Sequence, residues 1–559
     1  MDQQPVPETL FALYKRAATA RPNGPLFRLC EPDAIRDITG SEFLARAESL
    51  ACGMLAAGVS AGDRVGIVSE NRLEWIETDC AIQCAGAITV ALHAPLSAPQ
   101  VREQFLDSDP ALIFVSSATQ RDKVLQFHKE CSALRGVYTF DHDAATLATP
   151  YLDEIAIQPR AELLAQLATR ARFSYPDDTA AIIYTSGTTG ASRGASLTNR
   201  NLISNVASTA RMIPPEETPD PVLLNWLPLS HIFARSADLY GPLLRGLIIA
   251  LTPSIEALPG DLLRIHPDYL CGVPRLWEKL AAAAEPELES GDTGALRRLM
   301  GGRLRWGISG GAALNPRIAE AFAAAGVPLY QGYGLTETSP TVTCNFPSHS
   351  RLGSSGKAIP DVEVRIAEDG EILTRGPHIM KGYWRKPAET AAVIDADGWF
   401  QTGDIGELDD DGYLTITDRK KDILVTAYGK NVAPQQIENR LCSDRFIEQA
   451  FVYGDARPFL VALLVPRFKE LADWCVESEV PEPVRDAIDQ SPQIHELFHQ
   501  RISIALRDLA PHEQVRRFVL APGSFSISSG ELTVTAKLRR SQILANHREQ
   551  LDALYELSE

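Results

Sequence analysis

The chain has 559 residues, too many for one hydrophobic core, and ~100–200 residues per domain predicts two to four domains. Its composition, 45% hydrophobic and 23% charged, is that of an ordinary soluble globular protein. The net charge of -18 argues against general nucleic-acid binding and against anionic membrane surfaces, but not against ATP, for which a local cationic pocket suffices.

The first half alternates apolar, strand-like runs with helical patterns. Residues 64–68 predict a strand, residues 74–86 an amphipathic helix, and residues 87–92 and 111–115 two further strands. Strands separated by helices of this length are typical of a parallel α/β sheet. Ligands of such sheets bind beyond the carboxyl ends of the strands.

The pattern changes after about residue 362. Short alternating segments and turn dipeptides such as Asp397-Gly398 and Asp411-Gly412 predict hairpins. A mixed α+β pattern follows the charged segment 418–422, so we place a domain boundary there, giving domains 1–417 and 418–559. Residues 538–559 predict one helix with a polar end.

The cysteines indicate reduced thiols. Nine are present, an odd number with scattered spacing and no Cys-x-x-Cys, so a disulfide framework or zinc site is not expected and a cytoplasmic protein fits better. Cys80 and Cys84, one helical turn apart, are interpreted as packing residues. The polar start shows no secretory signal, and no window approaches ~20 apolar residues, so no transmembrane helix is predicted.

The most informative segment is 184–194, which directly follows an apolar run, residues 179–184. It contains five serine and threonine hydroxyls and three glycines, with a cation near its end, Arg193. Backbone N–H groups, hydroxyls and a positive charge that converge on one point suit a polyphosphate. The segment lacks the Gly-x-x-x-x-Gly-Lys-Ser/Thr pattern, so it predicts a phosphate loop of another type. A flexible linker is the alternative, but a buried-looking strand precedes the loop.

Five further segments carry candidate chemistry. The segment 330–338 combines an aromatic face, glycines, a hydroxyl and a carboxylate, and a carboxylate plus substrate phosphates is how Mg²⁺ is usually held. An ionised aspartate in the turn 398–404 is able to accept both hydroxyls of a ribose. Taken alone, each segment also has a simpler interpretation, which is weakest for 330–338. These alternatives are a tight turn at 308–314, a surface loop at 330–338, a turn aspartate at 398–404, a solvated charge run at 418–422 and an exposed lysine in 531–540.

Together and in this order, these segments resemble the ANL superfamily of adenylate-forming enzymes. The resemblance covers nearly the whole chain. Within the superfamily, the chain most resembles the long-chain acyl-CoA synthetase branch. The supporting segments are residues 227–235, 331–338, 418–431 and 454–462. It implies an α/β fold: a large N-terminal domain of parallel and mixed sheets with helices plus a distorted β-barrel, and a small, mobile α+β C-terminal domain.

The resemblance implies roles for the ATP-binding residues. The β- and γ-phosphates are expected in a cradle formed by Thr185, Ser186, Gly187, Thr188, Thr189 and Gly190. Thr185 and Glu337 are expected to hold Mg²⁺. The residues implied to contact adenine, the α-phosphate and the ribose are Gly311, Ala312, Gln331, Gly332, Tyr333, Thr336, Asp404 and Arg419.

The resemblance also implies a two-step reaction. A carboxylic acid and ATP first give an acyl-adenylate and pyrophosphate, with Lys537 bridging the attacking carboxylate and the phosphate. The small domain then reorients about a hinge at Lys421, and the segment around Gly429 comes beside the pantetheine of coenzyme A. His231 falls where the family places an acid-pocket residue; a core or helix-capping histidine is the alternative.

The chain departs from the family pattern at four places. Ser192-Arg193 replaces the usual Pro-Lys, so Arg193 keeps the charge with a different shape. Asn199 stands where a histidine is common, Val534 replaces a frequent proline, and Ala234 replaces a usual glutamate. No group that the mechanism needs is removed, and a divergent member with an unusual acid is suggested.

The leading hypothesis is an ATP-dependent acid:CoA ligase for a hydrophobic, long or bulky acid. An acyl-AMP ligase that loads an acyl carrier protein stays open, as do a non-catalytic binding protein of this fold and a homodimer. The expected small molecules are the acid, ATP, Mg²⁺ and coenzyme A; nucleic acid is not expected.

Overall fold

The computed structural model describes residues 5–146, 149–186, 192–216, 218–289, 292, 294–428, 430–481, 483–526, 528–532 and 538–556. The chain divides into two compact units. The first contains residues 1–365, 373–401 and 410–414, and the second residues 366–372, 402–409 and 415–559. The predicted boundary at residue 418 stays a prediction.

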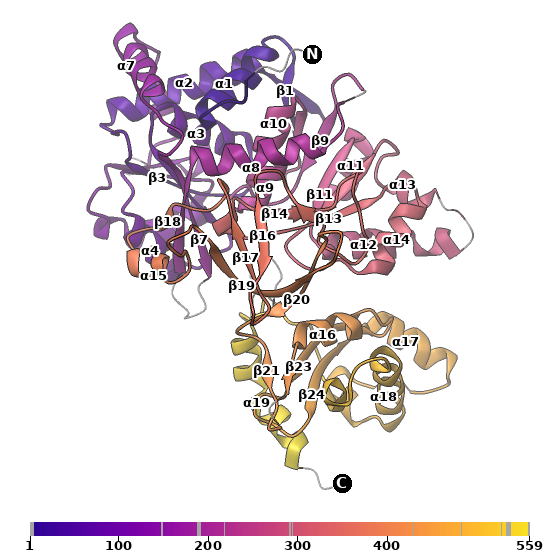
Figure 1. The fold of residues 1–559 in the computed structure, drawn as a ribbon. Helices are drawn as coiled ribbons and strands as arrows, with labels where there is room; N and C mark the ends of the chain where they lie inside the picture. Colours follow the sequence, from indigo (N-terminus) through magenta and orange to yellow (C-terminus); the bar gives the residue numbers. More distant parts are fainter. Residues whose placement is uncertain are drawn as a thin grey trace. The chain divides into compact units, whose positions relative to one another are not determined.

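One sheet of the first unit holds the predicted α/β core (Figure 1). Its strands β3, β4, β5, β6 and β7 run parallel to one another. Next to β7, β8 pairs antiparallel with β7, and β18 pairs antiparallel with β8. The four early elements predicted at 64–115 are confirmed within one to two residues. The order is β18 (Gly382–Tyr383), β8 (Ser192–Thr198), β7 (Thr179–Ser186), β4 (Ile88–His93), β3 (Arg64–Ser69), β5 (Leu112–Val115) and β6 (Gly136–Thr139).

A nine-stranded mixed sheet forms the other part of this unit. Its central strands are short and fully buried, as expected for strands covered on both faces. Its order is β15 (Lys357–Ala358), β14 (Thr341–Cys344), β13 (Leu329–Gly334), β12 (Trp306–Ser309), β11 (Tyr269–Gly272), β9 (Val222–Asn225), β10 (Ile248–Leu251), β1 (Pro25–Cys30) and β2 (Ile35–Thr39).

Helices cover these sheets with apolar faces, and several begin at side-chain caps. Thr39 and Glu42 form a reciprocal capping box at α2, and Thr198 caps α8. The helices of this unit are α1 (Leu10–Ala20), α2 (Gly40–Ala56), α3 (Leu73–Cys84), α4 (Ala98–Ser108), α5 (Ala118–Leu125), α6 (Leu152–Ile155), α7 (Ala161–Arg172), α8 (Asn199–Met212), α9 (Ile232–Ala234), α10 (Gly241–Arg245), α11 (Leu258–Ile265), α12 (Pro274–Glu289), α13 (Ala295–Leu299), α14 (Pro316–Ala324) and α15 (Pro387–Ala391).

The hairpin-rich segment after residue 362 forms a four-stranded sheet. Its strand order is β16 (Glu363–Ile366), β17 (Glu371–Arg375), β19 (Phe400–Leu408) and β20 (Leu414–Arg419). The turn dipeptide at Asp411-Gly412 lies between β19 and β20, as predicted, and Gly412 adopts a φ of 82° that favours glycine. The distorted β-barrel that the resemblance implies for the N-terminal domain stays a prediction.

The second unit has a three-stranded sheet with helices on both faces (Figure 1). Alternate residues of β23 and β24 point to opposite faces: one face packs on α16 and α18, the other on α19. Its elements are β21 (Leu424–Val425), β22 (Asn431–Val432), α16 (Pro434–Cys442), β23 (Ile447–Tyr453), β24 (Leu460–Pro466), α17 (Phe468–Glu477), α18 (Pro492–Leu506), β25 (Val515–Leu520) and α19 (Arg540–Glu556).

The predicted packing role of Cys80 and Cys84 is confirmed. All nine cysteines carry free thiols, and Cys80 and Cys84 are buried in the core as packing residues. Within the described part of the chain, the helices are too short or too polar to cross a membrane.

Candidate active site

The predicted phosphate loop is held between two paired strands. Thr185 ends β7 and lies opposite Arg193 at the start of β8, and its Oγ1 donates a long hydrogen bond of 3.4 Å to the Arg193 carbonyl. The predicted contacts from Gly187 to Gly190, and the side chain of Ser186, lie outside the described residues. The described structure therefore shows the two strands that carry the ends of this loop.

Arg193 is fixed from two sides. Its guanidinium lies 4.8 Å above the centre of the Tyr383 ring, and its Nη1 is 3.6 Å from a carboxylate oxygen of Glu389. Only 19% of the side chain is exposed, and within the described residues its Nε has no hydrogen-bond partner. A planar guanidinium can stack on an aromatic ring in this way, whereas a lysine ammonium has no plane to match. The departure from Pro-Lys thus accompanies a specific packing arrangement.

Tyr383 connects Arg193 to Glu337. Its hydroxyl donates a 2.9 Å hydrogen bond to Oε1 of Glu337, while the Met380 N–H donates to the Glu337 carbonyl. Burial raises the pKa of Tyr383, and the negative charge of Glu337 raises it further. Thr185, Arg193, Tyr383 and Glu337 therefore form one continuous chain of contacts. Two segments that are about 150 residues apart in sequence and independently predicted to bind ATP meet here.

Sequence reasoning missed Tyr383. The available signal was the run Lys381-Gly382-Tyr383-Trp384, where glycine and two aromatic residues occur together within the hairpin-rich region. Gly382 and Tyr383 form β18, which pairs with β8 at Ser196 and Ala195. This strand addition places the ring against Arg193, and nothing in the local pattern predicts that pairing.

The donor set around Glu337 fits Mg²⁺. Oε1 of Glu337 accepts a hydrogen bond from Tyr383, and among the described residues this is the one side-chain donor to the carboxylate. Over the same residues, no cluster of three or more metal-binding side chains occurs. Because Mg²⁺ is usually held by one or two carboxylates together with substrate phosphates and water, a single carboxylate such as Glu337 is an adequate protein contribution.

The predicted adenine slot lies at the ends of two parallel strands. Ser309 of β12 pairs with Gln331 of β13, so the exposed Gly311 and Ala312 emerge beside the segment that leads to Tyr333. Gln331 is fixed at both ends: its Oε1 accepts from the Leu314 N–H at 3.0 Å, and its Nε2 donates to Ser355 at 3.1 Å. Gln331 and the glycine turn thus lie at the ends of neighbouring strands, and their contact with adenine stays a prediction.

Close packing explains the glycines of this segment. A Cβ on Gly332 would lie 3.2 Å from the Cys344 sulfur, and one on Gly334 only 1.7 Å from the Pro340 carbonyl oxygen. Thr336 and Glu337 then lie in a short 3₁₀ turn, Thr336–Thr338, which Asn205 holds through bonds to the carbonyls of Thr338 and Thr341. The glycines let the chain approach β14 and present the turn.

The predicted ribose residues meet in the second unit. Arg419 Nε lies 3.0 Å from Oδ1 of Asp404, whose carboxylate is almost fully buried. Lys421, the predicted hinge, is exposed and follows Lys420, which pairs with Asp369 and Glu371 at 2.6 and 2.8 Å. The Asp404–Arg419 pair confirms that these two sequence motifs come together, whereas their ribose contact and the hinge stay predictions.

Besides the loop residues 187–190, two more predicted site residues lie outside the described residues, and a third has a visible structural role. Gly429 and Lys537 are the first two. The third is His231, whose Nδ1 accepts from the Phe233 N–H at 3.2 Å at the start of α9, as in the helix-capping alternative. Its ring also stacks on His93 with centres 6.1 Å apart, and His93 bonds to Ser230 at 2.7 Å. Burial lowers the pKa of His93 to about 4, so this ring is neutral at pH 7.

Comparisons with known proteins agree with the fold and the motifs. The AMP-binding enzyme family matches residues 14–384, and the AMP-binding enzyme C-terminal domain matches residues 421–559. The long-chain-fatty-acid–CoA ligase FadD15 of Mycobacterium tuberculosis is 33% identical, over 93% of this chain and 92% of its own length. The long-chain-fatty-acid–[acyl-carrier-protein] ligase AEE15 of Arabidopsis thaliana is 26% identical, over 90% and 80%.

A solved structure shares the whole architecture. The anthranilate CoA ligase AuaEII, in complex with anthranoyl-AMP, superposes with a TM-score of 0.78 over 98% of this chain and 99% of its own, at 19% identity. Fold and site together define an adenylate-forming enzyme of two units. The chain belongs to the AMP-binding enzyme family, in its long-chain acyl-CoA synthetase-like branch.

Proposed function

We propose that this protein is an ATP-dependent acid:CoA ligase that activates a hydrophobic, long-chain or bulky carboxylic acid. The observation that carries the proposal is the contact chain Thr185–Arg193–Tyr383–Glu337, because it joins the phosphate-loop strands to the carboxylate expected to hold Mg²⁺. The similarity to FadD15 over almost the whole length of both proteins supports a long-chain acid and coenzyme A.

In the first step, a carboxylate oxygen of the acid attacks the α-phosphorus of ATP. The bond from this phosphorus to the bridging oxygen breaks, and pyrophosphate leaves with both bonding electrons. Negative charge grows on the phosphate oxygens, so positioning and cationic stabilisation supply most of the rate. In this proposal Thr185 and Glu337 would hold Mg²⁺, which would offset the charge of the phosphates. Arg193 would add a fixed positive charge near them, and Lys537 would bridge the carboxylate and the α-phosphate.

In the second step, the thiolate of coenzyme A attacks the acyl carbon of the adenylate. The carbon–oxygen bond to AMP breaks, giving a thioester and free AMP. The Asp404–Arg419 pair would hold the ribose through both steps, since an ionised aspartate can accept both hydroxyls.

A second candidate is transfer to an acyl carrier protein. It is supported by the similarity to AEE15, whose name states that it uses a carrier protein, at lower identity than FadD15. In coenzyme A and in a carrier protein the thiol is the end of a phosphopantetheine arm, so the fold does not distinguish the two acceptors.

A two-stage assay tests these functions. Pyrophosphate release is measured with saturated acids of increasing chain length, ATP and Mg²⁺, and then thioester formation with coenzyme A or with a phosphopantetheinylated carrier protein. We expect release with long acids and a thioester with coenzyme A. Release followed by transfer only to the carrier would favour the second candidate, and the lack of release with every acid would favour a non-catalytic binding protein.

A further inference from the structure

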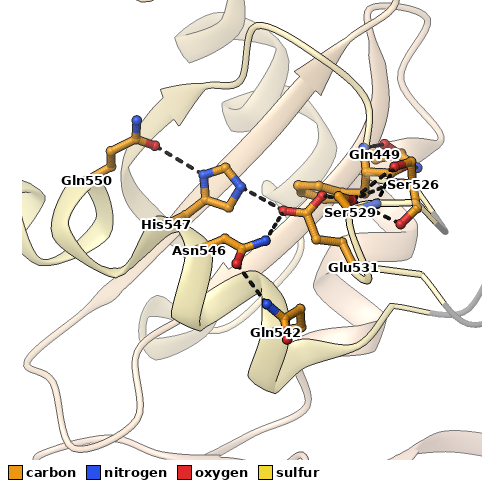
Figure 2. A network of polar contacts seen from close by, with 9 residues as sticks. Gln449, Ser526, Ser529, Glu531, Gln542, Asn546, His547 and Gln550 are labelled. Atoms are coloured by element: carbon orange, nitrogen blue, oxygen red, sulfur yellow. Dashed lines mark hydrogen bonds and ion pairs between the residues drawn. The ribbon is translucent and has the colours of Figure 1, made fainter. Parts of the chain in front are cut away.

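Two polar networks outside the candidate site each join a helix to a neighbouring segment. In the second unit, the carboxylate of Glu531 accepts hydrogen bonds from Asn546 and His547 of α19 at 3.0 Å each, which closes the helix onto the segment that precedes it (Figure 2). In the first unit, side chains of α4 bond to the strands β7 and β8. Because these strands carry Thr185 and Arg193, the network of α4 reaches residues of the candidate site.

Two neighbouring side chains of α4 hold Ser192, the first residue of β8. The Ser192 N–H donates a 3.0 Å hydrogen bond to Oε1 of Glu103, and Nε2 of Gln104 donates to the Ser192 hydroxyl at 3.3 Å. Glu103 is exposed, whereas Gln104 is only 6% exposed. The main chain and the side chain of Ser192 are thus each fixed by a different residue of the same helix.

The same helix also holds the strand beyond Arg193. Asp107 lies one turn after Glu103 and accepts a 2.6 Å hydrogen bond from the Tyr184 hydroxyl. Tyr184 pairs with Gly194, and a Cβ on Gly194 would lie 3.2 Å from the Tyr184 ring, so the ring covers this glycine. The contacts of α4 therefore fix the residues on both sides of Arg193, whose own side chain points to the opposite face of the strand.

The helix has an attachment of its own. Val101 and Phe105 of α4 are fully buried in an apolar cluster with residues of β3, β4 and β5. At the start of the helix, the Ser97 N–H donates a 3.0 Å hydrogen bond to Gln100. The bonds to Ser192 are not needed to keep α4 in place, so their effect falls on the strand that begins at Ser192.

A serine at this position depends on such contacts more than a proline does. Proline, the usual residue here in the family that the chain resembles, fixes φ through its ring and has no N–H to donate. Serine leaves φ unrestrained and adds one N–H and one hydroxyl, the two groups that Glu103 and Gln104 bind. The hydrogen bonds from α4 therefore provide the restraint that a proline ring would provide by itself.

We propose that Glu103 and Gln104 are positioning residues for the start of β8, and through it for Arg193, in the adenylate-forming step. The inference rests on the proposed function, which places the phosphates of ATP near Arg193. The contact chain of the candidate site passes through the residue that follows Ser192, so a loosely held Ser192 would loosen that chain.

The first test removes each contact and measures pyrophosphate release from acid and ATP at limiting ATP. Gln104→Leu removes the donor at similar volume, and Glu103→Ala removes the acceptor. Each is expected to lower kcat/KM for ATP about threefold and the double variant about tenfold, since an exposed or neutral hydrogen bond contributes modestly. Thioester formation from supplied acyl-adenylate and coenzyme A should stay within about twofold, because acyl-adenylate has no β- or γ-phosphate.

The decisive comparison is made in a Ser192→Pro background. Proline is tolerated at the first residue of a strand, and its ring restrains the backbone without either partner. Ser192→Pro alone should keep kcat/KM for ATP within about twofold of wild type. Adding Glu103→Ala and Gln104→Leu should then cause no further loss, because the three residues act as a unit. A general role of the two side chains in the stability of α4 would persist in this background.

Arg102→Ala is the matched control, since it removes an exposed ion pair with Glu130 from the same helix. It should leave kcat/KM for ATP unchanged. Hydrogen–deuterium exchange of residues 192–198 adds a measurement that needs no turnover. Exchange should be faster in the Glu103→Ala/Gln104→Leu double variant and should return to the wild-type level when Ser192→Pro is added.

Three results would overturn the inference: unchanged kinetics and exchange in the double variant, an equal loss in both half-reactions, or a loss that persists in full in the Ser192→Pro background. If the wild-type protein released no pyrophosphate with any acid, the proposed function would fail instead. The exchange measurement would still decide whether Glu103 and Gln104 hold Ser192, so the two failures are distinguishable.

Discussion

Replacing Tyr383 by phenylalanine removes the single hydroxyl that joins the Arg193 side to Glu337. The ring stays under the Arg193 guanidinium, 4.8 Å away, so the stacking contact is kept. The loss is the 2.9 Å hydrogen bond to Oε1 of Glu337. A hydrogen bond to a charged group contributes about 1.5–3 kcal/mol, and ~1.4 kcal/mol is tenfold in rate.

Glu337 is partly exposed, so the lower end of this range applies. We expect Tyr383→Phe to lower the rate of pyrophosphate release about tenfold, with a higher Mg²⁺ concentration needed for half-maximal rate. Tyr138→Phe is the control: it makes the same change in a ring that packs on Phe114. An unchanged rate and Mg²⁺ dependence in Tyr383→Phe would refute the positioning of Glu337 by this hydroxyl.

Three further predictions concern other parts of the molecule. Lys537→Ala should impair pyrophosphate release far more than thioester formation from supplied acyl-adenylate; equal losses would contradict its assignment. Arg193→Lys keeps the charge but loses the stacking on Tyr383, which contributes about 0.5–1 kcal/mol. The rate of adenylation should therefore fall no more than about fivefold. A much larger loss of rate would mean that the guanidinium binds phosphate through a bidentate contact. Burial raises the pKa of Glu77 from 4.5 to about 7, so its stabilising effect is complete below pH 4.5 and is lost as the pH rises through 7. The unfolding free energy of Glu77→Gln, measured with urea, should therefore gain about 3 kcal/mol on wild type between pH 5 and pH 8, and a constant difference would exclude a raised pKa.

The local sequence pattern predicted helices and strands well where the spacing of apolar residues followed a single periodicity. The apolar runs around residues 64–115 form the expected parallel strands because burial on both faces demands continuous apolar sequence. The final helix begins at Arg540, two residues later than predicted, because Leu538 is engaged in the bridge to Leu532.

The sequence motifs of the candidate site could be predicted, but the contacts between residues of different motifs could not. Asp404 and Arg419 were assigned together and do form a pair. Tyr383 was not singled out, since its contacts are with residues distant in sequence: Glu337 is 46 residues from Tyr383. Such contacts depend on strand addition and helix packing, which no local spacing encodes.

The central claim is that the acid's carboxylate attacks the α-phosphorus of ATP. It is tested most directly by supplying a long-chain acid labelled with oxygen-18 in its carboxylate, together with ATP, Mg²⁺ and coenzyme A, and locating the label by mass spectrometry. The account predicts that AMP carries one labelled oxygen for each thioester formed, because the attacking oxygen leaves with AMP in the second step. Unlabelled AMP, or labelled orthophosphate accompanied by ADP, would contradict it.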